Sequence, residues 1–205
     1  MSEELGKIEK PEAEGFKKGR KLYFVPLFYV GRDAPAEYLE KLDKYWHQVE
    51  QHINNLEAKL GQVSRIFQEL IPASGEDGVN TVKDLNEKCY EIVKSRLDKG
   101  VPLEATEDSE LLTEFMDWGR CLGIGLQNQK VFTRVYESYV EVSKKRNEFI
   151  AKHIDETLKA DEAGILFMRE GHQVQFPSDI EVFYVSPPAL DEINRWFRDR
   201  EAKSQ

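Results

Sequence analysis

The sequence predicts an α+β protein that is mostly helical, with long antiparallel helices forming a bundle beside a small sheet of three or four strands. Three observations support this prediction. A segment near the amino terminus is rich in Phe, Tyr and Val, the next segment repeats apolar residues every three or four positions, and strand-like runs return after residue 160. Because strand-like segments flank the helices, we expect both chain ends to build the sheet.

Length and composition set the expected domain organisation. The chain has 205 residues, of which 40% are hydrophobic and 33% are charged, so it can fill a hydrophobic core and is not wholly disordered. A length of this order suits one domain. We expect a mobile polar segment over residues 1–20 and a single α+β domain over 21–205. Within that domain, the helical bundle is assigned to 36–159, and the sheet platform to 21–30 together with 163–200.

The first strand and the first helix follow the polar segment. Residues 22–30 carry aromatic and β-branched side chains that suit a strand, although Pro26 interrupts it or places it at an edge. The next segment predicts one continuous helix from about residue 36 to 71. Its apolar positions alternate three and four apart, like the seam of a coiled coil: Leu39, Leu42, Trp46, Val49, Ile53, Leu56, Leu60, Val63, Phe67 and Leu70.

Three further helices are expected before residue 160. They cover about 80–99, a segment that starts near 108 and frays at glycines from 119, and a long segment over 128–159. If the first long helix leaves the sheet and the last one returns, those two helices run antiparallel. Arg146 falls on the otherwise apolar seam of the last helix, where a charged residue destabilises the fold unless it is paired.

The period changes after residue 160. Residues 165–176 read as a β-hairpin whose turn contains Gly171, and 180–185 read as a further strand. A terminal helix then opens in the Pro-containing segment that follows residue 186, and it carries Leu190, Ile193, Trp196 and Phe197.

Two His-Glu pairs raise the question of a metal site. His47 with Glu50 and His153 with Glu156 each place the two residues three apart on one helical face. Antiparallel helices would bring both pairs to the same end of a bundle, as in helical di-metal proteins. The order is His-x-x-Glu rather than Glu-x-x-His, however, and His47 lies beside the seam rather than on it. A metal site is therefore not favoured, and no cofactor is predicted.

The stranded arginine needs an acidic partner. Glu114 and Asp117 lie on the acidic third helical segment and are the candidates for an ion pair with Arg146. Such a buried pair would specify how the helices register rather than catalyse a reaction. Acids near a helix amino terminus also complement its dipole, so the cluster has a structural explanation.

Catalytic candidates are few. His172, in the predicted hairpin turn, lies near Ser178 and Asp179, but the chain has no nucleophile elbow and no recognisable oxyanion hole beside them. An enzyme or ligand-sensing protein would draw on His172, Asp179, His153 and Asp155, where the helices meet the sheet. This remains an alternative hypothesis.

A short basic segment precedes the first strand. Its cations are Lys17, Lys18, Arg20 and Lys21, which could contact RNA or ribosomal phosphates. The chain as a whole has 29 basic and 38 acidic residues, a net charge of −9, and this opposes general binding to polyanions. Nucleic-acid binding is possible but disfavoured.

The remaining features favour an interaction protein. No apolar run reaches the roughly 20 residues of a transmembrane helix, and Cys89 and Cys121 do not form a disulfide framework. We therefore expect a cytoplasmic protein without a membrane partner. The long seam and the lack of a catalytic motif predict an interaction or scaffold protein that acts through helical and sheet-edge surfaces, with a protein partner or a second copy of itself.

Overall fold

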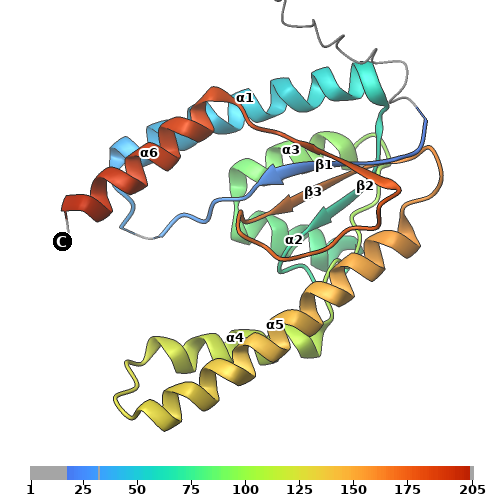
Figure 1. Ribbon diagram of the computed structural model, residues 1–205. Helices are drawn as coiled ribbons and strands as arrows, with labels where there is room; N and C mark the ends of the chain where they lie inside the picture. Colours follow the sequence, from blue (N-terminus) through green and yellow to red (C-terminus); the bar gives the residue numbers. More distant parts are fainter. Residues whose placement is uncertain (1–17, 32, 204–205) are drawn as a thin grey trace, which may run out of the picture.

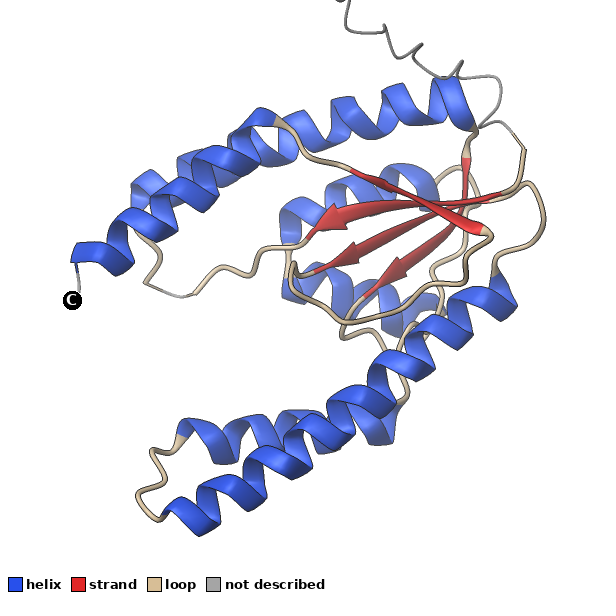
Figure 2. Cartoon of the chain, viewed as in Figure 1, coloured by secondary structure: helices blue, strands red, loops and turns tan. Residues whose placement is uncertain are grey.

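A computed structural model describes residues 18–31 and 33–203 (Figures 1 and 2). The mobile segment expected over residues 1–20 thus lies outside the described residues as far as position 17. Ten elements follow one another: β1 (Arg20–Pro26), α1 (Ala36–Leu60), β2 (Val63–Gln68), α2 (Gly75–Leu85), α3 (Glu87–Leu97), α4 (Ser109–Gly123), α5 (Gln129–Thr157), β3 (Ala163–Met168), β4 (Ile180–Tyr184) and α6 (Pro188–Lys203). As expected, helix predominates over strand.

The four described strands form one parallel sheet in the order β2-β3-β1-β4. Tyr23 in β1 lies opposite Ile165 in β3 on one side and Phe183 in β4 on the other. The step from β1 to β2 and the step from β3 to β4 go in opposite directions across the sheet. The first connection crosses on the face that carries α1, and the second crosses on the face that carries α5. That is what a single handedness of crossover requires.

Alternating side chains of the strands supply two hydrophobic cores, one on each face. Tyr23 and Val25 of β1 pack into the core that α1, α3 and α6 cover, whereas Leu22 and Phe24 pack into the core beneath α5. The second core also receives Val174 from the β3–β4 connection. Strands buried on both faces are typical of parallel sheets, whose crossovers cover both sides.

The first predicted helix is too long, and this changes the origin of the sheet. α1 ends at Leu60 because Gly61 adopts φ +138°, and the chain then enters β2. The seam continued into 63–70 only by coincidence: Val63 packs into one core and Phe67 into the other. The prediction that the sheet comes from both chain ends is therefore wrong, because β2 comes from the middle of the chain.

The predicted bundle of long antiparallel helices is also wrong. α1 and α5 lie on opposite faces of the sheet, and each precedes a parallel strand, so both run against the strands and in the same general direction (Figure 1). Their actual partners are different: α1 packs against α6, and α5 packs against α4. The sheet stands between the two helices that the sequence seemed to pair.

The predicted hairpin over 165–176 is replaced by a parallel crossover. β3 and β4 are not neighbours, since β1 lies between them, and residues 169–179 connect them across the face that carries α5. β3 is buried along its whole length. A continuous apolar run of this kind is the signature of a central parallel strand rather than of a hairpin arm.

The other helices follow the sequence closely. Asn86 ends α2 and caps α3 by accepting a hydrogen bond from the backbone N–H of Cys89, so the helix expected at 80–99 is two helices. Asp108 caps α4 and Asn128 caps α5 in the same way. Among the described residues, none of the helices is both long and apolar enough to cross a membrane.

Candidate functional site

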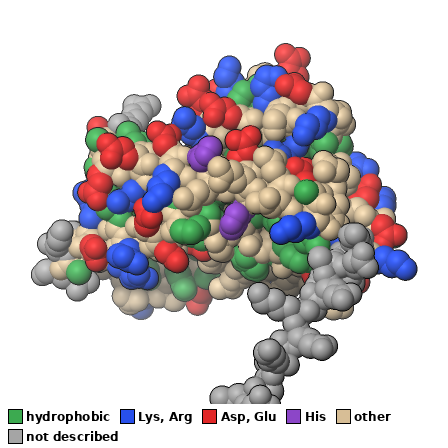
Figure 3. Space-filling view, turned by 90° about the horizontal axis from the view of Figure 1, so that it is seen from above, with side chains coloured by type: hydrophobic (Ala, Val, Ile, Leu, Met, Phe, Trp, Pro, Cys, Tyr) green, Lys and Arg blue, Asp and Glu red, His purple; other side chains and the backbone are tan. Residues whose placement is uncertain are grey.

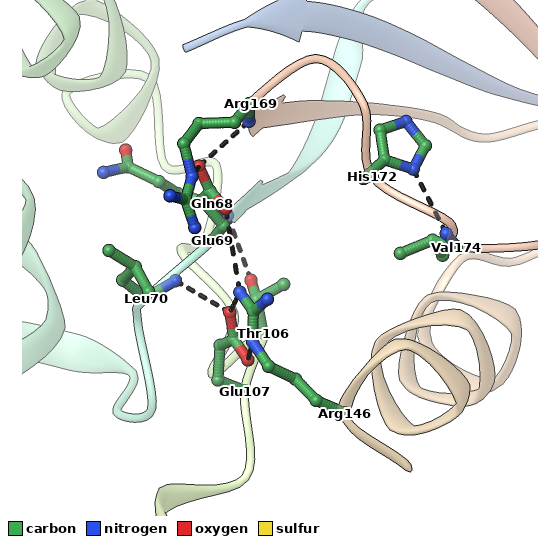
Figure 4. Close-up of polar contacts among 9 residues, drawn as sticks. All are labelled: Gln68, Glu69, Leu70, Thr106, Glu107, Arg146, Arg169, His172 and Val174. Carbon is green, nitrogen blue, oxygen red and sulfur yellow. Dashed lines mark hydrogen bonds and ion pairs between the residues drawn. The ribbon is translucent and has the colours of Figure 1, made fainter. Parts of the chain in front are cut away.

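The carboxyl ends of β2 and β3 carry a buried cluster of charged side chains, drawn in Figure 4. Open α/β sheets bind ligands at this edge, so it is the first place to look for a site. Arg146 of α5 donates from Nε to Oε2 of Glu107 at 2.7 Å, and its Nη2 contacts the other carboxylate oxygen of Glu107. The side chain of Arg146 is 5% exposed and that of Glu107 is fully buried.

A second pair adjoins the first. Oε1 of Glu69 accepts from the backbone N–H of Arg169 at 2.9 Å and from its Nε at 3.0 Å, while the Arg146 Nη2 lies 3.7 Å from Oε2 of Glu69. The backbone N–H of Leu70, which has φ +66°, donates to Glu107 at 2.8 Å. Two arginines and two glutamates thus make an electrically balanced cluster.

The cluster is a joint rather than a reaction centre. Its carboxylates accept from guanidinium groups and from backbone N–H groups of neighbouring elements, so each one holds two parts of the fold together. It fixes α5, at Arg146, to the carboxyl ends of β2 and β3. The predicted need of Arg146 for an acid is met, but not by Glu114 or Asp117. Glu114 accepts a hydrogen bond from Trp118 and Asp117 pairs with Arg120, because both acids lie on the exposed side of α4.

Of the four candidate catalytic residues, the structure brings together the two aspartates and leaves the two histidines apart from them. Asp155 and Asp179 both bind Arg20 at the amino edge of the sheet, where Arg20 also donates to the carbonyl oxygens at the end of α5. His172 lies in the β3–β4 connection, its ring centroid 4.8 Å from that of Phe24, and burial lowers its pKa. Its Nδ1 accepts from the backbone N–H of Val174.

His153 is likewise apart from these residues. Its ring stacks parallel to Phe149 with centroids 6.0 Å apart and meets the edge of Phe67. The four residues proposed for an enzyme site therefore have three separate structural roles. The two aspartates bind Arg20, His172 packs on Phe24, and His153 packs on Phe149 and Phe67.

The two His-Glu pairs cannot share a metal ion. His47 and Glu50 are exposed on α1, and His153 and Glu156 lie on α5, on the opposite face of the sheet. The proposed site required the antiparallel bundle, which does not form. Within residues 18–31 and 33–203, no group of three or more His, Cys, Asp or Glu side chains is placed to hold a metal ion.

The basic segment is largely used inside the fold. Lys17 lies outside the described residues. Arg20 is paired with two aspartates, and Lys21 is 1% exposed and donates to the carbonyl of Gly19. Lys18 is exposed. Figure 3 shows the side of α1 and α6, where acidic and basic side chains alternate rather than gather into one basic patch.

The most unusual surface belongs to a helical arm, defined here as residues 109–141 of α4 and α5. Figures 1 and 2 show this hairpin extending away from the sheet. In this fully described stretch, Phe115 is the only buried side chain; it stacks on Tyr139 at 5.1 Å and receives the Arg146 guanidinium over its ring. The arm is therefore fixed at its base and exposed along its length. Its exposed large apolar side chains are Met116, Ile124, Val131, Phe132, Tyr136 and Val140.

One flank of each arm helix is uncharged. On α4 the flank contains Leu112, Met116, Gly119 and Gly123, and on α5 it contains Phe132, Tyr136, Val140 and Ser143. Around each helix axis, the uncharged flank is rotated by about a quarter turn from the seam that joins the two helices. In both helices the rotation goes from a seam residue to the next residue in the chain. In antiparallel helices this places both flanks on the same side. We call this combined surface the uncharged arm face.

The opposite flank of α5 is charged. It carries Lys130, Arg134, Glu137, Glu141, Lys144, Lys145 and Glu148, several of which pair along the helix. The sequence does contain a signal for the arm face, because the helix has one charged flank and one uncharged flank beside its apolar seam. The signal was not recognised, because the predicted bundle would have buried the uncharged flank.

Comparison with known proteins adds no candidate. Neither a protein-family model nor a curated protein sequence nor a solved structure matches the chain.

Proposed function

We propose that the protein is an interaction protein that pairs with a second copy of itself through the uncharged arm face. One observation carries the proposal: the arm exposes Tyr136 by 50%, Val140 by 46% and Phe132 by 38% on a flank without charge. Helices in water bury their apolar stripes against another element. Contiguous exposed apolar surface of this kind marks interaction sites.

A second copy fits this face better than an unrelated partner, because the face contains both shapes that a two-fold interface needs. The α5 flank presents the rings of Phe132 and Tyr136, and the α4 flank presents Gly123, with Gly119 nearer the seam, where an added Cβ would lie 3.8 Å from Tyr139. A Cβ added at Gly123 would meet nothing within 4 Å, so the surface there is open. In an isologous pairing, the rings of each copy face the glycines of the other, and the two hairpins make a four-helix bundle.

The lack of charge favours the same partner. Each copy has a net charge of −9, so two copies repel unless they meet on a neutral surface. The arm face is about 22 Å long and about 20 Å wide, and pairing would bury about 900 Å² in total. This is close to the lower limit of about 1,000 Å² for specific interfaces, so we expect micromolar affinity.

The test is the molar mass of the protein in solution across a concentration series. Sedimentation equilibrium should give a monomer when dilute and a dimer when concentrated. The double variant Tyr136→Lys/Val140→Lys should remain monomeric throughout, because it places four cations in one interface. Both positions are exposed, so the variant should keep its fold, which circular dichroism checks.

The matched control is Glu137→Lys, which changes charge on the opposite flank of the same helical turn. It should dimerise like the natural chain. A natural chain that stays monomeric over the whole series overturns the proposal, and so does a double variant that dimerises normally.

We place this function in the cytosol, which the unpaired state of Cys89 and Cys121 supports.

The sheet edge, the second surface considered from the sequence, exposes fewer large apolar side chains than the arm does. At β2, Leu103 bridges to Ile66, and at β4 the side chain of Tyr184 is 60% exposed.

A further inference from the structure

A shallow cavity of about 790 Å³, open to solvent, lies where the loop after β1 meets α1 and the last turns of α6. Its volume is within the range of about 300–1,000 Å³ that small-molecule sites occupy. It stands beyond the carboxyl end of a central strand, where open parallel sheets place their ligands. It lies on the face of α1 and α6, whereas the arm belongs to the opposite face, so this site is independent of the proposed self-association.

The walls of the cavity are aromatic. Tyr38 and Trp196 stack with their centroids 5.0 Å apart and their planes 18° apart, and Phe197 meets the ring of Tyr38 edge-on. Tyr29 completes the wall. The Tyr29 hydroxyl is buried, and it finds no hydrogen-bond partner among the described residues. Because this hydroxyl is closed off from the surface and is influenced by the charges of Glu69 and Arg169, what the cavity itself offers a ligand is aromatic ring faces.

The charges around the cavity are biased toward acid. Asp33 and Glu201 line it, and Arg200 is the one cation among its described lining residues. Arg200 already uses the rings, since its guanidinium carbon lies 4.8 Å from the centroid of Trp196. On another side Arg169 stands 5.8 Å from the centroid of Tyr29. Trp196 is thus covered by Tyr38 on one face and by Arg200 on the other, and the cavity rings left for a ligand are those of Tyr29, Tyr38 and Phe197.

We propose that this cavity binds an organic ammonium ion, that is, a ligand with an alkylated ammonium head. Ring faces attract such a head through the negative face of the aromatic quadrupole, and an alkylated ammonium is poorly hydrated, so little solvation is lost. The carboxylates of Asp33 and Glu201 add long-range attraction. The volume of the cavity leaves room for a further part of the ligand beyond the head.

The probe is choline, compared with 3,3-dimethylbutan-1-ol, which has the same shape but no charge. Ligand-observed NMR titration of the full chain measures both dissociation constants. Choline should bind at least about tenfold more tightly than its neutral analogue, the factor expected of about 1.4 kcal/mol of cation–π and carboxylate attraction. Equal binding of the two probes, or no binding of choline at millimolar concentration, overturns the proposal.

Two variants locate the site. The double variant Asp33→Asn/Glu201→Gln keeps the volume of both side chains at exposed positions, and it should weaken choline binding several-fold. Asp199→Asn is the matched control, because Asp199 is an exposed acid of the same helix that does not line the cavity. Trp196→Leu should abolish binding. If the double variant binds choline as tightly as the control does, the cavity is not the site.

Discussion

The two halves of α5 behave differently, although they form one continuous helix. From Arg146 onward, the helix packs Ile150 and Ile154 against the sheet, and its end is held by Arg20. Before residue 142, it packs along α4 and buries none of its side chains. The carboxyl-terminal half draws its stability from tertiary packing, and the amino-terminal half depends on a pair of helices that is marginal in water.

The difference shows where the molecule can change without unfolding. Segments with few buried contacts open locally at a small fraction of the global free energy, and binding surfaces come from such segments. The arm has this property, and the sheet does not. Arg146 stands at the boundary between the two halves, so removing its side chain should have the largest effect on stability.

Arg146→Met should give the largest effect. It leaves the carboxylate of Glu107 buried without its counter-ion, and the loss of a buried partner lowers the free energy of unfolding by about 3–5 kcal/mol. Urea unfolding followed by circular dichroism measures the change. Arg120→Met is the control, because it removes an exposed pair on the arm, and we expect a loss of about 0.5 kcal/mol or less. Equal losses in the two variants would contradict the assignment of Arg146 as the joint.

The reactivities of the two cysteines report the local stability of the sheet region and of the arm. Cys89 is fully buried under the sheet, burial raises the pKa of its thiol, and its Sγ lies 3.4 Å from Oε1 of Gln68. Cys121 is partly exposed on the arm, away from the uncharged arm face. A thiol reagent should modify Cys121 of the native protein at least about 100-fold faster than Cys89. Peptide mass spectrometry over time measures both rates in one sample, and similar rates would refute the difference in local stability.

Two glycines should respond with opposite signs. At Gly78, a Cβ would stand 2.2 Å from the carbonyl oxygen of Ala73, so Gly78→Ala should destabilise the protein by more than about 1 kcal/mol. At Gly123, the last residue of α4, nothing lies within 4 Å, so Gly123→Ala should stabilise the helix by about 0.3 kcal/mol, less than in a helix interior. If the arm pairs as proposed, the same substitution weakens self-association. Thermal unfolding and sedimentation measure the two effects separately, and a dimer of unchanged affinity would remove Gly123 from the interface.

The smallest effect concerns pH. Burial lowers the pKa of His172 below 6.5, so the unfolded chain binds a proton before the folded chain does. The stability contributed by the neutral ring is complete above pH 6.5 and is lost as the pH falls toward the folded pKa. His172→Gln should flatten this slope, with a difference in Tm on the order of 1 °C between neutral and mildly acidic buffer. A Tm slope that is steeper in the variant than in the natural chain would show the sign to be wrong.

The sequence predicted most individual elements and few of their relationships. A strand near 22–30, helix starts near 108 and 128 and the two last helices follow from local patterns, and the structure has them at Arg20–Pro26, Ser109, Gln129 and Pro188. The β2 strand was hidden because its apolar residues happened to continue a helical period, although Gly61 and the run of Val, Ile and Phe after it pointed to a break. The pairing of α1 with α5 failed because helix periodicity identifies an apolar face but not the element that covers it.

The site was predictable in part for the same reason. The sequence identified Arg146 as a buried cation in need of an acid, because that is a property of one helix. Its partners are Glu107, in the segment before α4, and Glu69, just after β2, and only the tertiary fold brings these three together. The cavity could not be foreseen, because the loop after β1 and the last helix are more than 150 positions apart in the chain.

The order of the strands has a consequence for synthesis on the ribosome. β1 and β2 are both made early, yet neither pairs with the other, and both hydrogen-bond to β3, which begins at Ala163. At about 5–20 residues per second, the first strand waits on the order of 10 s for its partner to be translated. During that time its backbone N–H and C=O groups have no neighbouring strand to pair with, and its Phe, Tyr and Val side chains have no finished core. The nascent chain therefore depends on α1 to cover β1 before the sheet can exist.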